Sequence, residues 1–474
     1  MPAYVSGPSE LPARVDAIGC LDGTTSADFR FLHMGLPPQI VRLKSAGELK
    51  RAIELCDQML ARGIAPQLAG CLRAERYRMR ELPRAYCIPF DRAIEMVQAE
   101  WPTFGKEDWD RLIDSGRIDW RLIEGVPCVL ETFLDSLRIY PSEVPGLAPE
   151  PPRDTAARDA MLGKMRRQGS CRYVVTIKAA IDVLGARRGD AVRAWLPVPR
   201  ACALQSDIEI IDATPGCAIA PQDAPARTAF WESSAASHFE ITYRYQTHAS
   251  YLDWAGGARG AALPKDPAPV SADLAEDAPH IIFTPYLRAL ADRLVGNVED
   301  PLARAKAIYD YVTGNVDYRY QPAYFELDSI ADECAHALRG DCGVMALLFI
   351  ALCRIAGIPA RWQSGLSVAP DHVGPHDWAQ FYIEDRGWLY ADCSFGSSAR
   401  RLGEVARREH YFGNLDPWRM VANGRFQAEL TPCDRSIRHD PYDNQVGEAT
   451  VNGRGCRDYE MRRTVELIDM VEVQ

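Results

Sequence analysis

The sequence predicts an α+β protein built from three consecutive parts. Hydrophobic residues recur at helical spacing over residues 1–145 and alternate with polar residues from about 170 to 250. From about residue 284, helical patterns come first and strand patterns follow. We therefore expect a helical domain over 1–145, a β-sandwich over 165–252 and an α+β domain over 280–474. A chain of 474 residues is long enough for more than one hydrophobic core.

The composition is that of an ordinary globular protein, with 47% hydrophobic and 25% charged residues. The net charge of −11 leaves no basic excess to neutralise phosphates, so we expect no nucleic-acid partner. No stretch approaches about 18 uncharged apolar residues, and the N-terminus lacks the pattern of a signal peptide, so we expect no membrane association. The 14 cysteines show no paired spacing, which favours a reducing, cytoplasmic location.

The first part is predicted to be mostly helical. Ser45 and Glu48 form a capping-box pattern before a periodic stretch that stops at Gly63. A short imperfect repeat follows over 108–113 and 119–123, with Asp-Trp at the start of each copy and Leu-Ile at its end. We interpret the two copies as similar helical turns that pack their tryptophans. We expect no chemistry in this domain.

The second part begins after a predicted linker, marked by five prolines between residues 141 and 152. Beyond it, short segments with a two-residue hydrophobic period are separated by turn residues, a pattern typical of a β-sandwich. The stretch 254–280 is rich in Gly, Ala, Pro and Asp and predicts a long connection to the third part.

The third part is predicted to have its helices first and its sheet second. Helical periodicity over 284–314 precedes an irregular stretch with Tyr318 and Tyr320, and an apolar helix begins at Cys342. Strands are expected over 360–366, 377–384 and 388–393.

Cys342 lies where a cysteine becomes reactive, at the first turn of a helix. The unpaired N–H groups of a helix start favour thiolate over thiol and can donate to an oxyanion. Cys353 lies within the same helix among apolar residues and is interpreted as core. Cys334 is interpreted as a packing residue rather than a resolving thiol. The sequence therefore predicts Cys342 as a nucleophile.

His376 and Asp392 are the predicted partners of this thiol. A strand after His376, a turn at 385–387 and a second strand ending at Asp392 would place them on adjacent antiparallel strands. The imidazole would take the thiol proton, and the carboxylate would orient the imidazole. A register slip of one residue would instead put the two side chains on opposite faces.

Three other residues compete for these roles. His372 is a rival base, and Asp385 is a rival orienter that the pattern places at the hairpin tip. Asp377 is interpreted as solvated or as a turn ligand. The segment 410–419 combines turn residues with aromatics, so it either folds over the site or forms a surface loop.

Four motifs together resemble the core of the transglutaminase-like superfamily. They are Arg339 to Gly343 around the cysteine, Ala356 to Arg361 after its helix, His376 to Trp378, and Trp388 to Asp392. The resemblance covers about residues 285–415 and carries the catalytic triad onto Cys342, His376 and Asp392. Residues 171–250, with Trp195 to Pro199, resemble the β domain that precedes this core in bacterial members. Residues 1–145 resemble no family that we recognise.

The resemblance implies a papain-like fold that cleaves or exchanges amide bonds through a thioester. It does not choose among peptidase, deamidase, deglycosylase and amide-forming transferase. It also implies an aromatic or amide side chain near the oxyanion, for which Tyr318 and Tyr320 are the candidates beside the backbone N–H of Cys342. Trp378 is a candidate for lining a substrate groove, with cross-strand packing as the alternative.

No motif for a nucleotide, metal or cofactor is present: the sequence has no GxxxxGK[ST], GxGxxG or HExxH, and no Cys and His residues at zinc-ligand spacing. We therefore expect no cofactor and no metal. The leading prediction is a cysteine hydrolase acting on a peptide or related amide. The alternatives are an amide-forming acyltransferase that uses the same triad and a non-catalytic binding protein on the same fold.

Overall fold

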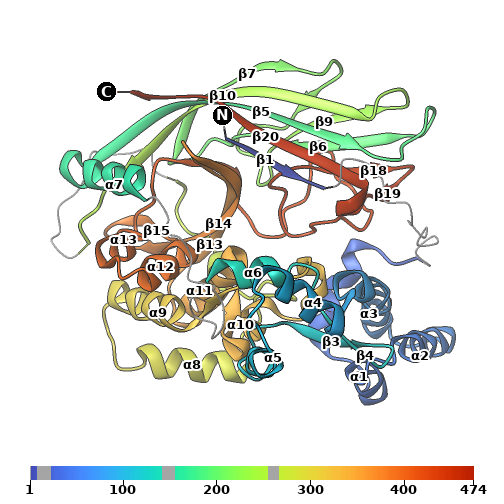
Figure 1. Ribbon diagram of the computed structural model, residues 1–474. Coiled ribbons are helices and arrows are strands. Elements are labelled where there is room, and N and C mark those ends of the chain that lie inside the picture. Colours follow the sequence, from blue (N-terminus) through green and yellow to red (C-terminus); the bar gives the residue numbers. More distant parts are fainter. Residues whose placement is uncertain (1, 8–22, 141–154, 255–265, 474) are drawn as a thin grey trace.

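The computed structural model describes residues 2–7, 23–140, 155–254 and 266–473. Strands gather at the top of Figure 1, and most helices lie below them. The predicted proline linker falls outside the described residues, as do residues 255–265 of the predicted connection. None of the described helices is both long and apolar enough to cross a membrane.

The N-terminal region is mainly helical, as predicted. It contains the 3-10 helix η1 (Ser26–Met34) and the helices α1 (Pro38–Ser45), α2 (Leu49–Ala61), α3 (Pro66–Ala85), α4 (Phe90–Glu100), α5 (Lys106–Asp114) and α6 (Phe133–Ile139). Ser45 ends α1, and Glu48 is the N-cap of α2, so the predicted capping box does not open a helix. Gly63 follows α2 with a φ of 68°, which confirms the predicted stop.

The second copy of the predicted helical repeat is a strand, so that prediction was wrong. Strand β3 (Trp120–Ile123) pairs with β4 (Val126–Val129), which also pairs with β2 (Ile88–Pro89). Glu124 and Gly125 join β3 to β4 with φ values of 48° and 82°, the left-handed pair that tight hairpins favour. The two tryptophans do pack together, because the Phe90 ring lies 5.2 Å from Trp109 and 5.5 Å from Trp120.

The β-sandwich consists of two antiparallel five-stranded sheets. One has the order β1 (Ala3–Ser6), β20 (Met461–Val473), β5 (Ser170–Val183), β10 (His238–Ser250) and β7 (Gln205–Ala213). The other has the order β19 (Arg454–Gly455), β18 (Glu448–Val451), β6 (Val192–Pro197), β9 (Thr228–Ser233) and β8 (Ala218–Ile219). Their facing side chains form one core, and α7 (Ala156–Gln168) precedes β5.

The sandwich draws strands from both ends of the chain and so extends beyond the predicted range 165–252. Strand β20 pairs with β5 along nearly its whole length, and β1 pairs with β20. Figure 1 shows the blue β1 beside the red β20. The alternating pattern of β20 supplies Met461, Val465 and Leu467 to the sandwich core. The α+β region therefore does not include the last strands of the chain.

The α+β region has its helices first and its sheet second, as predicted. Its helices are α8 (Pro285–Val295), α9 (Pro301–Asn315), α10 (Ile330–Ala337), α11 (Cys342–Ile355), α12 (Cys393–Arg401) and α13 (Val405–His410), with the 3-10 turn η4 (Tyr324–Glu326). Its sheet has the order β16 (Phe412–Gly413), β15 (Gly387–Ala391), β14 (His372–Ile383), β13 (Ala360–Ala369) and β17 (Arg419–Asn423). A short parallel pair joins β11 (Asp317–Tyr318) to β12 (Arg339–Gly340).

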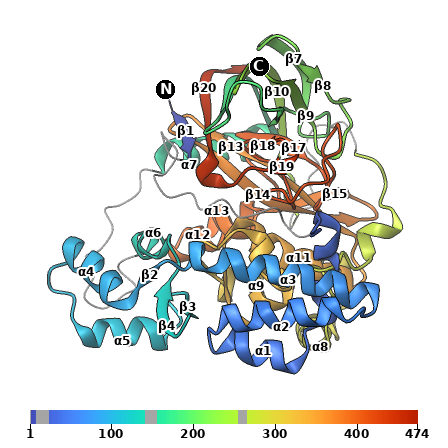
Figure 2. The ribbon, with the colours of Figure 1, turned by 90° about the vertical axis from the view of Figure 1, so that its right-hand side faces the viewer.

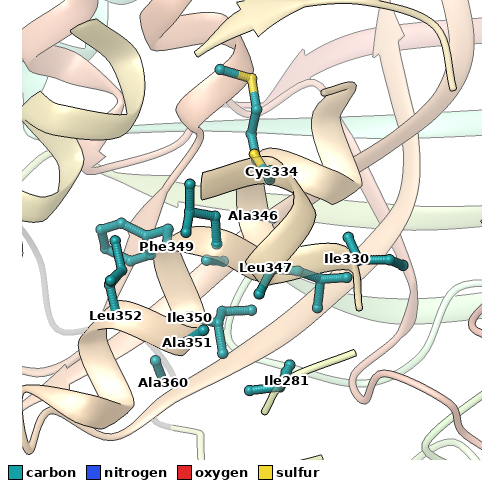
Figure 3. Packing of buried hydrophobic residues seen from close by; sticks show 14 of the residues in the cluster. Ile281, Ile330, Cys334, Ala346, Leu347, Phe349, Ile350, Ala351, Leu352 and Ala360 are labelled. Atoms are coloured by element: carbon teal, nitrogen blue, oxygen red, sulfur yellow. The ribbon is translucent and has the colours of Figure 1, made fainter. Parts of the chain in front are cut away.

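Helix α11 is the centre of the largest core. Its residues from Gly343 to Arg354 are all buried, and they pack against α8, α9, α10 and one face of the sheet. Figure 3 shows this packing, with Leu347 and Ile350 of α11 among the labelled side chains and Cys334 of α10 beside them. Cys334 and Cys353 are both core residues, as predicted.

The sheet contacts two neighbours through one face. Ala379 and Phe381 of β14 pack toward α11, while Val373 of the same strand enters the sandwich core. Alternate residues of a strand point to opposite faces, so His376 and Trp378 face the other way. Trp378 belongs to a separate small cluster with Tyr411 and Leu415.

The N-terminal helices do not form a wholly separate domain. Phe29 of η1 and Tyr77 of α3 pack on Phe325 and join the same core as α11. Helices α4 to α6 have a core of their own and lie to the left of the main body in Figure 2.

Candidate functional site

Cys342 begins α11, because Asp341 caps that helix. The Asp341 side chain accepts a hydrogen bond from the backbone N–H of Val344 at 3.1 Å. A Cβ on Gly343 would lie 2.2 Å from the Tyr324 hydroxyl oxygen and 2.8 Å from Asp377 Oδ2, so only glycine fits beside the cysteine. The cysteine itself is half-buried.

His376 and Asp392 lie together, on one face of the β14–β15 hairpin. The distance from His376 Nε2 to Asp392 Oδ2 is 2.7 Å, and both residues are buried. The turn at 384–386, one residue earlier than predicted, and a register that pairs Ala379 with Ala391 produce this contact. The register slip that the sequence left open therefore does not occur.

The Asp392 carboxylate has four partners. It accepts from the backbone N–H of Phe395 at 2.9 Å and from the Ser394 hydroxyl at 3.1 Å, and Arg419 lies 2.9 Å away. Burial alone would raise the pKa of Asp392, but His376 and Arg419 hold it well below its ordinary value. The carboxylate therefore stays ionised and can orient the imidazole.

His376 is a neutral imidazole at neutral pH. Burial lowers its pKa, although Asp392 acts in the opposite direction. The ring stacks on Phe395, with centroids 4.4 Å apart. Because Nε2 is engaged by Asp392, Nδ1 is the nitrogen that could exchange a proton with a thiol or a substrate.

Cys342 is hydrogen-bonded to Asp377 and not to His376. Its Sγ donates to Asp377 Oδ2 at 3.2 Å, and among the described residues no hydrogen bond joins Cys342 to His376. Asp377 follows His376 in β14 and points to the opposite face. The structure thus brings His376 and Asp392 together and places Cys342 against Asp377, the residue that follows His376 in β14.

The thiol is surrounded by groups that oppose its ionisation. Burial raises the pKa of Cys342 well above the ordinary value, and the carboxylates of Asp377 and Asp341 raise it further. The backbone N–H of Asp377 has a smaller effect in the other direction. The thiolate expected from the helix start is therefore not favoured in this conformation.

Asp377 was predicted to be solvated or to be a turn ligand, and that prediction was wrong. The residue is 5% exposed, and its second oxygen accepts from the side-chain amide of Gln445. Alternation along β14 points it under α11, where water does not reach it.

Tyr318 and Tyr320 lie on the N-terminal side of the thiol. Strand β11 pairs with β12 just before Cys342, which places Tyr318 beside the cysteine. Burial raises the pKa of Tyr318, and the charges of Cys342 and Asp341 raise it further, so the phenol keeps its proton and can donate. Tyr320 is 42% exposed, with its ring 6.1 Å from that of Tyr318.

Trp378 does not line a groove. It is fully buried, and its indole N–H donates to Gln363 Oε1 at 2.9 Å. The prediction of a groove residue was wrong, because Trp378 lies on the covered face of the sheet with Tyr411 and Val421. Trp378 packs in a buried cluster, and its neighbour across the strands is Gln363.

A cavity of about 590 Å³ borders His376. It lies between α6, α7, the start of β14 and α12, and both aromatic and polar side chains line it. The lining includes Tyr140, Arg158, Tyr318, Tyr320, His372, His376, Ser394, Phe395, Tyr411 and Trp418. The cavity has a volume suitable for part of a peptide or another small substrate.

The structure also shows where the two competing residues, His372 and Asp385, and the segment 410–419 lie. His372 is exposed at the start of β14 and lines the cavity, and Asp385 is exposed at the hairpin tip. The segment 410–419 is buried, so it is not a surface loop. It ends at Arg419, which bridges Asp392 and Asp416.

Sequence reasoning missed Arg419, Asp416 and Gln445. Arg419 and Asp416 belong to the segment that was left open between two interpretations, and no local pattern connects them with Asp392. Gln445 lies more than 60 residues after Asp377 in the chain. Among the described residues, no group of three or more Cys, His, Asp or Glu is arranged to hold a metal ion.

A cysteine at the start of a buried helix, beside a hairpin whose two strands bring a His and an Asp together, defines the class of cysteine-based catalytic folds. Residues 288–393 match the family model described as the transglutaminase-like superfamily. The match confirms the resemblance that the motifs predict over about 285–415. The α+β region therefore contains a transglutaminase-like core.

Solved structures show partial similarity. A candidate cysteine protease from Cytophaga hutchinsonii is 16% identical, with a TM-score of 0.39, over 64% of this chain and 90% of that one. The periplasmic domain of TgpA from Pseudomonas aeruginosa is 15% identical, with a TM-score of 0.27, over 52% of this chain and 95% of that one. No curated protein matches the chain.

Proposed function

We propose that the protein is a cysteine-dependent hydrolase that cleaves a peptide or related amide bond through a thioester. The observation that supports this most is the half-buried thiol of Cys342 at the start of α11. It is hydrogen-bonded to Asp377, the residue that follows His376, and His376 is paired with Asp392. This is the residue set of a thiol nucleophile, a base and an orienting carboxylate.

In the proposed reaction, the Cys342 side chain leaves Asp377 and gives its proton to His376 Nδ1 as the sulfur attacks the carbonyl carbon. The backbone N–H of Cys342 and the Tyr318 hydroxyl are the proposed donors to the oxyanion. The imidazolium then protonates the leaving amine as the C–N bond breaks. Water, deprotonated by the same imidazole, hydrolyses the thioester and restores the thiol.

The experiment that tests this proposal is active-site labelling followed by intact-mass spectrometry. The protein is incubated with a panel of activated acyl esters, and amide hydrolysis is measured with the acyl groups that label it. We expect one adduct, on Cys342, and no adduct or hydrolysis with Cys342→Ala. Cys433→Ala, which removes an exposed cysteine, is the matched control and should behave as the native protein does. Full hydrolysis by Cys342→Ala would refute the proposal.

An amide-forming acyltransferase is the first alternative. The burial of His376 and Asp392 favours it, because a site that excludes water allows an amine to take the acyl group. Adding a primary amine to the labelled protein separates the two functions. A hydrolase releases mainly the acid, and a transferase releases mainly the amide.

A non-catalytic binding protein is the second alternative, favoured by the pairing of the thiol with Asp377 rather than with His376. A thiol that no electrophile labels at neutral pH would support it. A cytoplasmic location and the absence of nucleic-acid and membrane partners stay predictions from the sequence.

A further inference from the structure

The Asp377 carboxyl is fixed from two sides. One oxygen accepts from the Cys342 thiol at 3.2 Å, and the other accepts from Gln445 Nε2. Asp443 is a further hydrogen-bond partner of Asp377 and also bonds Ser364, the residue that pairs with Asp377 across β13 and β14. The carboxyl therefore cannot turn away from the sulfur without breaking several contacts.

The groups around the thiol are predominantly acidic. Six ionisable residues interact with the thiol or with one of the carboxyls next to it. They are Asp341 at the cap of α11, Tyr318 in β11, Tyr324 in η4, Asp377 in β14, and Asp440 and Asp443 between β17 and β18. Arg438 interacts with Asp440 and Asp443 and is hydrogen-bonded to Glu448, and Arg463 interacts with Asp440. Among the described residues, none of the arginines or lysines donates a hydrogen bond to Asp377.

This arrangement differs from that of an activated cysteine. A reactive thiol is held near a cation or an imidazolium, which stabilises the thiolate. Here the direct partner of the sulfur is a carboxyl, which accepts the hydrogen bond of the thiol and, when it is ionised, repels a thiolate. His376, which precedes Asp377 in β14, is hydrogen-bonded to Asp392 instead.

We propose that Asp377 is a positioning residue that holds the Cys342 thiol protonated and hydrogen-bonded to its own carboxyl rather than to His376, so that the resting protein is a weak nucleophile. The inference rests on the proposed function, because it takes Cys342 as the nucleophile. It adds a resting state of the site that is controlled by a residue outside the predicted triad.

Gln445 and Asp443 extend this control to the segment between β17 and β18. Gln445 stabilises the charged carboxylate by donating to it. Loss of that donor should favour the protonated carboxyl, which does not repel a thiolate. Residues that follow the transglutaminase-like core in the chain therefore influence its nucleophile.

The test is the pH dependence of Cys342 alkylation by iodoacetamide, followed by mass spectrometry of the peptide that contains Cys342. Asp377→Asn keeps the shape and removes the charge. We expect the midpoint of the alkylation profile to fall by about one pH unit or more, with a roughly tenfold faster reaction at a fixed pH below both midpoints. Asp385→Asn, at the exposed tip of the same hairpin, is the matched control and should leave the profile unchanged.

A second variant, Gln445→Leu, keeps the carboxyl and should lower the midpoint by a smaller amount. It also provides the test if Asp377→Asn does not fold, as judged by circular dichroism. An unchanged midpoint in both variants would make Asp377 a packing residue and overturn the proposal. Slower alkylation would overturn it too, because it would make the carboxyl a base that helps the thiol.

This experiment needs no substrate, so its outcome is independent of the amide assay. A lowered midpoint without any amidase activity would support the resting state and contradict the hydrolase. Amidase activity with an unchanged midpoint would support the hydrolase and contradict the resting state.

Discussion

His376 and Asp377 are neighbours in one strand, yet they lie in opposite electrostatic environments. On the His376 side, the buried carboxylates of Asp392 and Asp416 share Arg419, and Asp392 is hydrogen-bonded to the imidazole. On the Asp377 side, a thiol meets carboxyls with no cation bonded to them among the described residues. In the resting site, the thiol is therefore paired with a carboxyl and not with the imidazole that would serve as its base. Catalysis then requires the thiol to change partner.

The largest expected effect comes from removing the base. His376→Ala should lower amide hydrolysis roughly 10²- to 10⁴-fold, because the imidazole both accepts the thiol proton and protonates the amine. The measurement is kcat/KM with a substrate found by the acyl panel. His372→Ala, four residues earlier on the same strand, is the control and should lose less than tenfold. Equal losses in the two variants would contradict the assignment of the base.

Removing the shared cation should affect folding more than any exposed substitution does. Arg419→Gln leaves Asp392 and Asp416 buried without their counter-ion, so the free energy of unfolding should fall by about 3–5 kcal/mol. Urea denaturation followed by tryptophan fluorescence measures it. Arg386→Gln, in the hairpin turn, should change stability by at most about 0.5 kcal/mol. If Arg419→Gln lowered the free energy of unfolding only slightly, the His376 side would tolerate carboxylates without a bonded cation, as the Asp377 side does.

The two faces should also give opposite pH dependences of stability. The pKa of Asp392 is lower in the folded protein, so Asp392 stabilises the fold above its unfolded pKa of about 4. That contribution disappears as pH falls through the lower folded pKa. The pKa of Asp377 is raised on folding, so its contribution is complete below about pH 4 and is lost as pH rises through the folded pKa.

Two amide variants check this difference. Asp392→Asn should remove part of the loss of stability in acid, and Asp377→Asn should remove part of the loss at higher pH. Each change should be about 1–3 kcal/mol over the pH range in which the group titrates. The measurement is urea denaturation from pH 3 to pH 9. If both variants changed the slope of unfolding free energy against pH in the same direction, the two faces would be electrostatically alike, which would contradict this prediction.

The smallest effect is expected from the oxyanion candidates. Tyr318→Phe removes a phenol beside the thiol and should lower kcat by about tenfold or less, with little change in KM. Tyr320→Phe is a matched control in the same cavity, because its side chain is more exposed. If only Tyr320→Phe lowers kcat, Tyr318 is not the donor.

Local signals predicted the helix at Cys342 and the hairpin that joins His376 to Asp392. The apolar run after Cys342 and the Asp-Arg-Gly turn each involve only neighbouring residues, so the sequence displays them directly. The environment of Asp377 was not predictable in this way. It depends on the face of β14 that α11 covers and on Gln445, which reaches the site from a distant part of the chain.

The same reasoning explains the errors in the fold. Trp120 to Ile123 resembles residues 109–113, which are helical, but a tight turn to β4 makes it a strand. The pairing of β20 with β5 joins residues nearly 300 positions apart, and a two-residue period indicates a strand without naming its partner. Arg419 was missed for a similar reason, since its bond to Asp392 is made only after β17 enters the sheet.

The contact between Gln445 and Asp377 bears on how the protein can be divided. A fragment that stopped at residue 393, where the family match ends, would keep Cys342, His376 and Asp392 but lack Arg419, Asp443 and Gln445. Its cysteine would meet a different set of neighbours, and measurements on such an excised piece would not describe the thiol of the whole protein.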